Sequence, residues 1–251
     1  MTDRLALEIL SQPDDTTCGP TCLHALYRYW DDSVALDDLI EQVPALPTGG
    51  TLGVHLATHA LRRGYDAHIY TYNLQLFDPT WLAEGVDLAE RLRRQRAFKT
   101  DPRLREATDA YLEALEVGAR ITLEDLTPAL IRRHLRRGEP VLTGLSSTFL
   151  YRSSRETPAD DVADDVRGEP VGHFVILCDY DTKSRQVGVA DPYEQNPVAP
   201  GQHYSVSIER LVGAILLGVL TYDANLIVIR PGRARRGSGS GRVDAKPDRR
   251  Q

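Results

Sequence analysis

Residues 11–30 read SQPDDTTCGPTCLHALYRYW, and this stretch predicts a loop that delivers Cys18 to the start of a buried helix. Gly19 and Pro20 follow the cysteine, and proline is tolerated in the first helical turn because its missing N–H has no intrahelical partner there. Apolar side chains then recur at helical spacing and predict a broad buried face: Cys22, Leu23, Leu26, Tyr27 and Trp30. We therefore expect this helix to be central to the core.

The position of Cys18 favours a reactive thiol. Free backbone N–H groups and the positive end of the helix dipole stabilise a thiolate over a thiol, and the thiolate is the nucleophile. Gln12, six residues upstream, has a side-chain amide that can donate to the oxyanion formed when sulfur attacks a carbonyl. The alternative is that Cys18 is only a small buried hydrophobe. That interpretation suits Cys22 better, since it lies four residues further along the same helix face.

Length and composition are those of an ordinary globular chain. Of 251 residues, 41% are hydrophobic and 26% are charged, and the formal net charge is −6. This charge gives no general attraction to nucleic acid, so we expect no nucleic-acid partner. The most apolar segment, 211–220, is too short to cross a bilayer, so we expect no membrane association. Three cysteines and residues 1–15, which lack a signal-peptide pattern, predict a cytoplasmic location.

Helical patterns dominate the first half of the chain, and strand patterns dominate the second. We expect helices over 36–43, from a cap at Thr51 to Gly64, two within the charged region 78–118, and over 123–137, with a strand over 65–72. After Gly138 the pattern predicts strands over 140–146, 172–180, 186–190 and 224–229, with a helix over 207–217. This order predicts an α+β fold in which the helical half packs on a C-terminal antiparallel sheet.

Two polar segments stand apart from a single domain that we expect over residues 1–230. Residues 153–170 form an acidic insertion before the third predicted strand, and we interpret it either as a mobile flap over a site or as a disordered insertion. Residues 231–251 are rich in arginine and glycine, and they predict a disordered tail.

A cysteine nucleophile needs a base or imidazolium partner, and His173 has the most suitable setting among the histidines. It follows Gly172 at the start of an apolar strand, and the next predicted strand ends at Asp191. A residue at a strand end can project into a cleft, and an aspartate there can accept from the imidazole and fix its tautomer. We therefore predict that Cys18, His173 and Asp191 act together.

Metal binding is a weaker hypothesis for this sequence. His55 and His59 are four residues apart on a predicted helix, but Leu56 stands where a zincin motif has glutamate. A further group lacks a second ligand pair at zinc-finger spacing: Cys18, Cys22 and His24. Cys178 lies within an apolar strand and is expected in the core. We expect neither a metal nor a cofactor.

Four parts of the sequence together resemble the papain-like cysteine peptidases of the double-glycine, bacteriocin-leader-processing family: Gln12, residues 16–23, residues 172–176 and residues 191–193. The resemblance is strongest to stand-alone bacterial members and extends along residues 5–230. It implies a papain-like fold in which Cys18 is the nucleophile, His173 the general base, Asp191 the orienting residue and Gln12 the oxyanion donor. Members carried by exporters are fused to membrane spans and an ATPase, and this sequence shows neither, so the resemblance does not extend to their secretion role.

Three functions agree with these residues. The leading hypothesis is a cysteine peptidase or amide hydrolase that forms an acyl-enzyme on Cys18, with a peptide or amide as substrate. The same site would perform amide ligation, transpeptidation or deamidation if a nucleophile other than water intercepted the acyl-enzyme or the substrate were a side-chain amide. The third hypothesis is a peptide-binding module that has kept the fold without catalysis.

Overall fold

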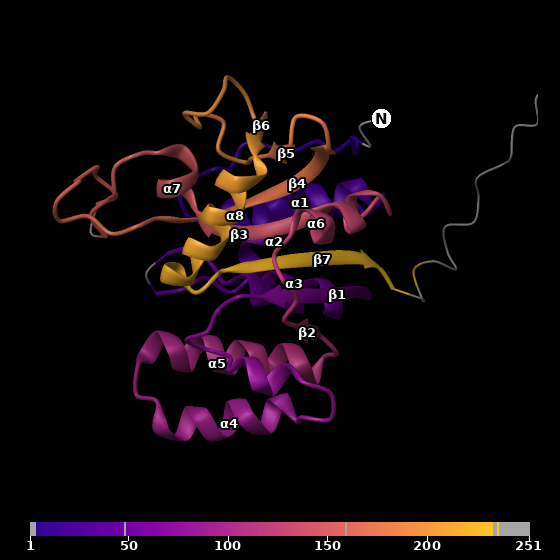
Figure 1. Cartoon of the computed structure of the whole chain (residues 1–251), viewed down its shortest axis with the longest axis vertical. Helices are drawn as coiled ribbons and strands as arrows, with labels where there is room; N and C mark the ends of the chain where they lie inside the picture. The colour runs from indigo at the N-terminus through magenta and orange to yellow at the C-terminus, as the bar shows by residue number, and fades with distance from the viewer. Residues whose placement is uncertain (1–3, 48, 159, 233–234, 236–251) are drawn as a thin grey trace, which may run out of the picture.

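A mixed seven-stranded sheet forms the centre of the computed structural model, which describes residues 4–47, 49–158, 160–232 and 235 (Figure 1). The strands follow the order β2-β1-β7-β3-β4-β5-β6 across the sheet. Their bounds are β1 Tyr65–Thr71, β2 Arg120–Thr122, β3 Val141–Ser146, β4 Gly172–Asp181, β5 Gln186–Ala190, β6 His203–Ser207 and β7 Asn225–Pro231. Strands β1 and β2 are parallel, and the other neighbours are antiparallel.

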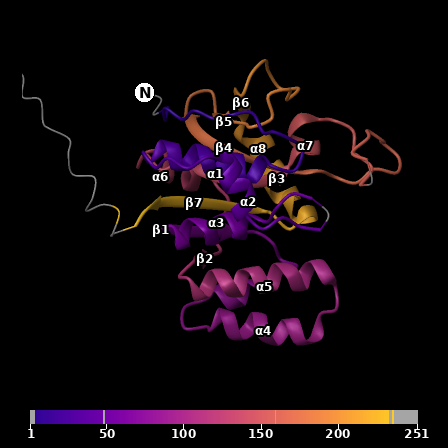
Figure 2. The same ribbon diagram turned by 180° about the vertical axis from the view of Figure 1, so that it is seen from behind.

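Helices cover both faces of this sheet, and each face has its own apolar core (Figures 1 and 2). One face carries α1 (Cys18–Tyr29), α2 (Leu36–Gln42) and α3 (Gly53–Arg62), and the other carries α6 (Pro128–Leu135), α7 (Ser147–Tyr151) and α8 (Ile208–Leu217). Strand β4 shows why two cores form, because alternate side chains point to opposite faces. Phe174 and Ile176 belong to the core under α1, whereas Val175 and Leu177 belong to the core under α8.

The charged region after β1 forms a helical hairpin outside the sheet (Figure 1). A short 3-10 helix (Pro79–Leu82) leads into α4 (Leu88–Phe98) and α5 (Pro102–Glu116), and α5 packs against α3. The helix starts are capped, because Asp87 accepts from the Glu90 N–H and Asp101 accepts from the Leu104 N–H. The two charged helices predicted within 78–118 are therefore confirmed.

The α+β prediction is confirmed, and the structure corrects several of its details. The sheet also contains β1 from the N-terminal half, and helices from the C-terminal half cover its second face. Two strands and one α-helix were not predicted: β2, β6 and α7. Thr51 does not cap α3, because its hydroxyl donates to the Pro44 carbonyl at 2.7 Å and the side chain of Asp223 accepts from the Gly53 N–H instead. The predicted helix over 123–137 begins only at Pro128, where Thr127 caps it.

The structure describes nearly all of the first polar segment and only the start of the second. Residues 153–170, except 159, fold back on themselves, and β-bridges join Glu156 to Ala163 and Glu169. These bridges give the segment an ordered backbone, unlike the disordered insertion of the second interpretation. Strand β7 continues to Pro231, and the Arg235 Nε donates to the Arg63 carbonyl at 2.9 Å. Most of the predicted tail, namely 233–234 and 236–251, lies outside the described residues. Within the described part of the chain, no helix has the length and apolar character of a membrane span.

Candidate active site

Cys18 is the first residue of α1, and the residue before it leaves the N–H groups of this helix start without a side-chain cap. The side chain of Thr17, the preceding residue, makes no capping hydrogen bond, and Cys18 is 7% exposed. Unpaired N–H groups at such a helix start favour negative charge nearby. Gly19 allows the helix start to approach the α3 region closely, because a Cβ at this position would lie 2.7 Å from the Cγ2 of Thr51. This contact gives a physical reason for glycine directly after the cysteine.

The loop before Cys18 is fixed by its own side chains. The Oδ1 of Asp14 accepts from both the backbone N–H and the hydroxyl of Thr16 at 2.8 Å. The hydroxyl of Thr17 donates to the Asp14 carbonyl at 3.2 Å. These bonds hold the turn that leads into α1, so the position of Cys18 is set by both the loop and the buried helix.

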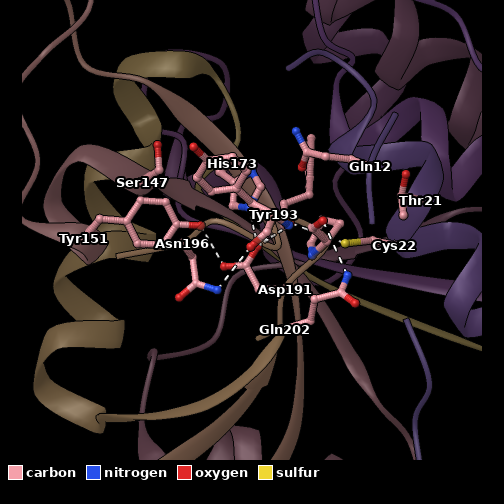
Figure 3. A network of polar contacts seen from close by, with 12 residues as sticks. Gln12, Thr21, Cys22, Ser147, Tyr151, His173, Asp191, Tyr193, Asn196 and Gln202 are labelled. Carbon is pink, nitrogen blue, oxygen red and sulfur yellow. Dashed lines mark hydrogen bonds and ion pairs between the residues drawn. The ribbon is translucent and has the colours of Figure 1, made fainter. Parts of the chain in front are cut away.

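His173 and Asp191 form a buried pair beside this helix start (Figure 3). His173 is the second residue of β4, and Asp191 directly follows β5, which pairs with β4. The Nε2 of His173 lies 2.8 Å from the Oδ1 of Asp191. The Cys18 side chain is close enough to raise the pKa of the imidazole, and because Nε2 bonds to Asp191, Nδ1 is the ring nitrogen left for the sulfur. The structure thus places Cys18 near the bonded pair of His173 and Asp191.

Charge dominates over burial at His173. Burial alone lowers the pKa of this imidazole, but the Asp191 carboxylate and the Cys18 side chain raise it to about 10. Burial raises the pKa of Asp191, and the charge and hydrogen bond of His173, helped by two tyrosine hydroxyls, more than reverse this effect and lower it. The two groups therefore form an imidazolium–carboxylate pair at neutral pH.

Two tyrosines that the sequence did not single out complete the surroundings of Asp191. The hydroxyls of Tyr151, at the end of α7, and Tyr204, on β6, each donate to the Oδ2 of Asp191 at 2.6 Å. The backbone N–H of Tyr193 donates to Oδ1 at 2.9 Å. The alternation of Tyr204 and Val206 with polar residues in HYSVS was a signal for β6, whereas no local pattern marks Tyr151.

Gln12 lies near this group and is held in two ways (Figure 3). Its backbone N–H donates to the carbonyl of Pro192, the residue after Asp191, at 3.0 Å. Its Nε2 donates to the Asp14 carbonyl at 2.8 Å, and its Oε1 is buried without a hydrogen-bond partner among the described residues. The amide therefore sits between the loop before Cys18 and the loop after Asp191.

The other candidate cysteines and histidines are held by contacts that stabilise the fold. The Sγ of Cys22 donates to the Phe174 carbonyl at 3.3 Å, and burial raises the pKa of Cys22 well above its ordinary value. Cys178 lies in the core, and burial raises its pKa to about 11. His59 bonds to the Tyr27 hydroxyl through Nδ1 at 2.8 Å. Across the residues that the structure describes, no three His, Cys, Asp or Glu side chains are grouped to hold a metal ion.

The α+β fold, with a buried cysteine at a helix start beside a strand histidine, has the form of a papain-like cysteine peptidase. A family model matches residues 4–207, and the chain belongs to the family that it describes, the Peptidase_C39 like family. The matched range contains all four predicted site residues, while α8 and β7 follow it. No curated protein sequence matches the chain at a significant level.

Solved structures with a similar fold have low sequence identity to this chain. A putative C39-like peptidase from Bacillus anthracis is 13% identical, with 90% of this chain and 96% of that chain covered and a TM-score of 0.47. Xylellain, a cysteine protease from Xylella fastidiosa, is 13% identical, with coverage of 91% and 84% and a TM-score of 0.45. A double glycine motif protease from an AMS/PCAT transporter, solved with its leader peptide, is 11% identical, with coverage of 91% and 94% and a TM-score of 0.43.

Proposed function

We propose that this protein hydrolyses a peptide or related amide bond through an acyl-enzyme on Cys18. The observation that supports the proposal is the buried His173–Asp191 pair, with the Cys18 side chain near enough to raise the pKa of the imidazole. Membership of the Peptidase_C39 like family supports a peptide substrate. Amide hydrolysis requires such a pair, because the imidazolium supplies the proton that the leaving amine needs.

The reaction follows from the positions of these groups. The thiolate of Cys18 attacks the carbonyl carbon of the amide, and His173 gives its proton to the nitrogen as the C–N bond breaks. The acyl group is then bonded to sulfur, and the amine leaves. Neutral His173 takes a proton from water, the hydroxide attacks the acyl carbon, and the C–S bond breaks to release the acid. Asp191 keeps a proton on the Nε2 of His173 throughout, so that Nδ1 performs both transfers.

The oxyanion needs donors close to the sulfur, and two sources are available. The first N–H groups of α1 have no side-chain cap, and they point toward the end of the helix at which Cys18 lies. Gln12 is the second source, and its fixed place between the loops that carry Asp14 and Pro192 supports this role. Its Nε2 uses one N–H for the Asp14 carbonyl and has a second N–H for substrate.

The cytoplasmic location and bacterial origin stay predictions. All three cysteines are free and buried, in agreement with a reducing compartment.

Cleavage of a mixed peptide library, followed by trapping with a peptide aldehyde, tests the proposed function. We expect the intact chain to release new peptide ends and to carry the aldehyde on Cys18, as read by mass spectrometry of digested protein. The Cys18→Ala variant should lose both signals, whereas Cys178→Ala, which changes a core thiol outside the site, should keep both. Library cleavage that persists in Cys18→Ala would contradict the proposal.

A further inference from the structure

The Asp191 carboxylate depends on hydrogen-bond donors from the protein because it is fully buried. Its side chain is 0% exposed, and a carboxylate in such a place needs a hydrogen-bond donor at each oxygen. His173 and the Tyr193 N–H satisfy Oδ1. Two phenol hydroxyls satisfy Oδ2, those of Tyr151 and Tyr204 (Figure 3). Each phenol hydroxyl is bonded to Asp191, so the hydroxyls act on the chemistry through this carboxylate.

We propose that Tyr151 and Tyr204 are positioning residues that hold the Asp191 carboxylate with Oδ1 directed at His173. The inference rests on the proposed function of Cys18, His173 and Asp191, and it extends that site to two further side chains. Both hydroxyls lie 2.6 Å from Oδ2, which is the short distance typical of an O–H donor on a charged acceptor.

The two phenols fix the carboxylate because they approach it from different elements. Tyr204 lies on β6, the strand that pairs with β5, whereas Tyr151 is the last residue of α7. Turning the carboxylate would break both of these bonds together with the bond to His173, so one orientation is strongly preferred. Burial and the charge of Asp191 raise the pKa of both phenols well above their ordinary value, so they remain donors throughout the working pH range.

Tyr151 also links the site to the acidic segment 153–170. Its ring centroid lies 6.0 Å from that of His173 and 6.3 Å from that of Tyr193. The next residue, Arg152, has a φ of 58°, so the chain turns sharply as it leaves α7 and enters the segment. The segment is thus anchored at its start by a side chain that contacts both members of the His173–Asp191 pair.

The ionisable groups around Asp191 decide which pH effects to expect. They come from four elements that surround this carboxylate: His173 from β4, Tyr151 from α7, Tyr204 from β6 and Cys22 from α1. Replacing His173 would remove a charge, and replacing Cys22 would remove a thiol. Replacing either tyrosine with phenylalanine removes only a hydroxyl. Tyrosine to phenylalanine changes therefore isolate the contribution of the two donors.

The test compares Tyr151→Phe, Tyr204→Phe and the double variant with the intact chain, by the pH dependence of Cys18 alkylation with iodoacetamide and of kcat/KM. Without a phenol donor, Asp191 is protonated at a higher pH, and the imidazolium loses its partner. We expect the acidic midpoint of both profiles to move up by about one unit in each single variant and further in the double variant. The alkaline midpoint and KM should stay in place. Tyr180→Phe, a control in the same buried core, should leave both midpoints unchanged.

An unchanged acidic midpoint in folded Tyr151→Phe would overturn the inference, even if its activity fell, because a purely structural role lowers the active fraction without moving a midpoint. Tyr151 is less buried than Tyr204, so this variant keeps the test available if Tyr204→Phe fails to fold. The proposed function fails separately, and earlier, if the intact chain shows no faster alkylation of Cys18 than of its other cysteines.

Discussion

The proton on His173 governs how the site responds to pH. Burial opposes the charge on this imidazole, but Asp191 and Cys18 raise its pKa to about 10. The imidazolium is therefore present at neutral pH and is lost only as pH rises through the folded value. The His173–Asp191 ion pair therefore persists over a broad neutral range, and the upper end of that range is the loss of the His173 proton.

Replacing Asp191 with asparagine tests this dependence. Asp191→Asn removes the charge that holds the proton on His173, so the pKa of His173 should fall by at least one unit, as expected for loss of an adjacent opposite charge. The alkaline midpoint of Cys18 alkylation should move down by the same amount, which a pH series of alkylation rates measures. Asp38→Asn changes an exposed carboxylate on α2 and should have no effect. An alkaline midpoint that stays in place in Asp191→Asn would contradict this view of His173.

Oxyanion donation by Gln12 can be separated from any contribution of this residue to substrate binding. Gln12→Ala removes an oxyanion donor that acts mainly in the transition state, so kcat should fall by about 100-fold with little change in KM. Gln202→Ala is a matched control, because the Nε2 of Gln202 donates to the same Pro192 carbonyl that holds the backbone of Gln12. Steady-state kinetics on a cleaved peptide gives both constants. Equal losses in the two variants would show that Gln12 acts only through loop structure.

At the residue scale, the sequence predicted the members of the site that have local signals. Cys18 stands before a Gly-Pro helix start, and His173 and Asp191 stand at strand ends. Tyr151 and Tyr204 were missed because their role depends on contacts with Asp191 from separate elements. A buried tyrosine is usually a core residue, and the sequence does not show which buried carboxylate its hydroxyl meets.

The start of α3 shows how one element is stabilised by another. Asp223 precedes β7 and is fully buried, and its Oδ1 accepts from the Gly53 N–H at 2.7 Å and from the Asn225 amide at 3.5 Å. Burial raises the pKa of Asp223 to about 7, although these two hydrogen bonds oppose the shift. The folded chain therefore keeps a proton on this carboxyl that the unfolded chain releases at a lower pH. The free energy of unfolding should fall as pH rises from about 4 to 7 through this group.

Asp223→Asn removes the free-energy cost of ionising this buried carboxyl and retains an acceptor for the Gly53 N–H. We expect the variant to gain stability relative to the intact chain as pH rises, by about 2 to 4 kcal/mol between pH 4 and pH 8, the range that a shift of this size supports. Urea unfolding at the two pH values measures the difference. Asp181→Asn, at the last residue of β4, is the control. A stability difference between Asp223→Asn and the intact chain that is the same at both pH values would exclude the titration of Asp223 as its cause.

Element types were predicted where the pattern was long and periodic. The helix after Cys18 and the apolar strand that begins at Gly172 follow directly from spacing. The missed elements are short: β2 has 3 residues, and α7 and β6 have 5 each. The error at Thr51 has a different cause. A threonine before a helix usually caps it, but here a carboxylate from a distant part of the chain takes that position.

At the scale of the whole molecule, β7 joins two parts of the sheet. It lies between β1, from the N-terminal half, and β3, which leads to the strands that carry the site. The sequence predicted the strand itself but not its place, because the pairing of strands far apart in the chain has no local signal. The α4–α5 hairpin packs on α3 at the opposite end of the molecule from β5 and β6, so it lies away from the strand that Asp191 follows (Figure 1).

The central claim is that a helix starting at position 18 and a strand containing position 173 meet to make one thiol reactive. Competitive alkylation of the native protein by iodoacetamide near neutral pH, read for each cysteine by mass spectrometry, tests it most directly. We predict that Cys18 is labelled at least about 100-fold faster than Cys22 and Cys178, whose pKa values are raised by burial, and that His173→Ala abolishes this advantage. Equal, slow labelling of all three cysteines in the folded chain would contradict the account.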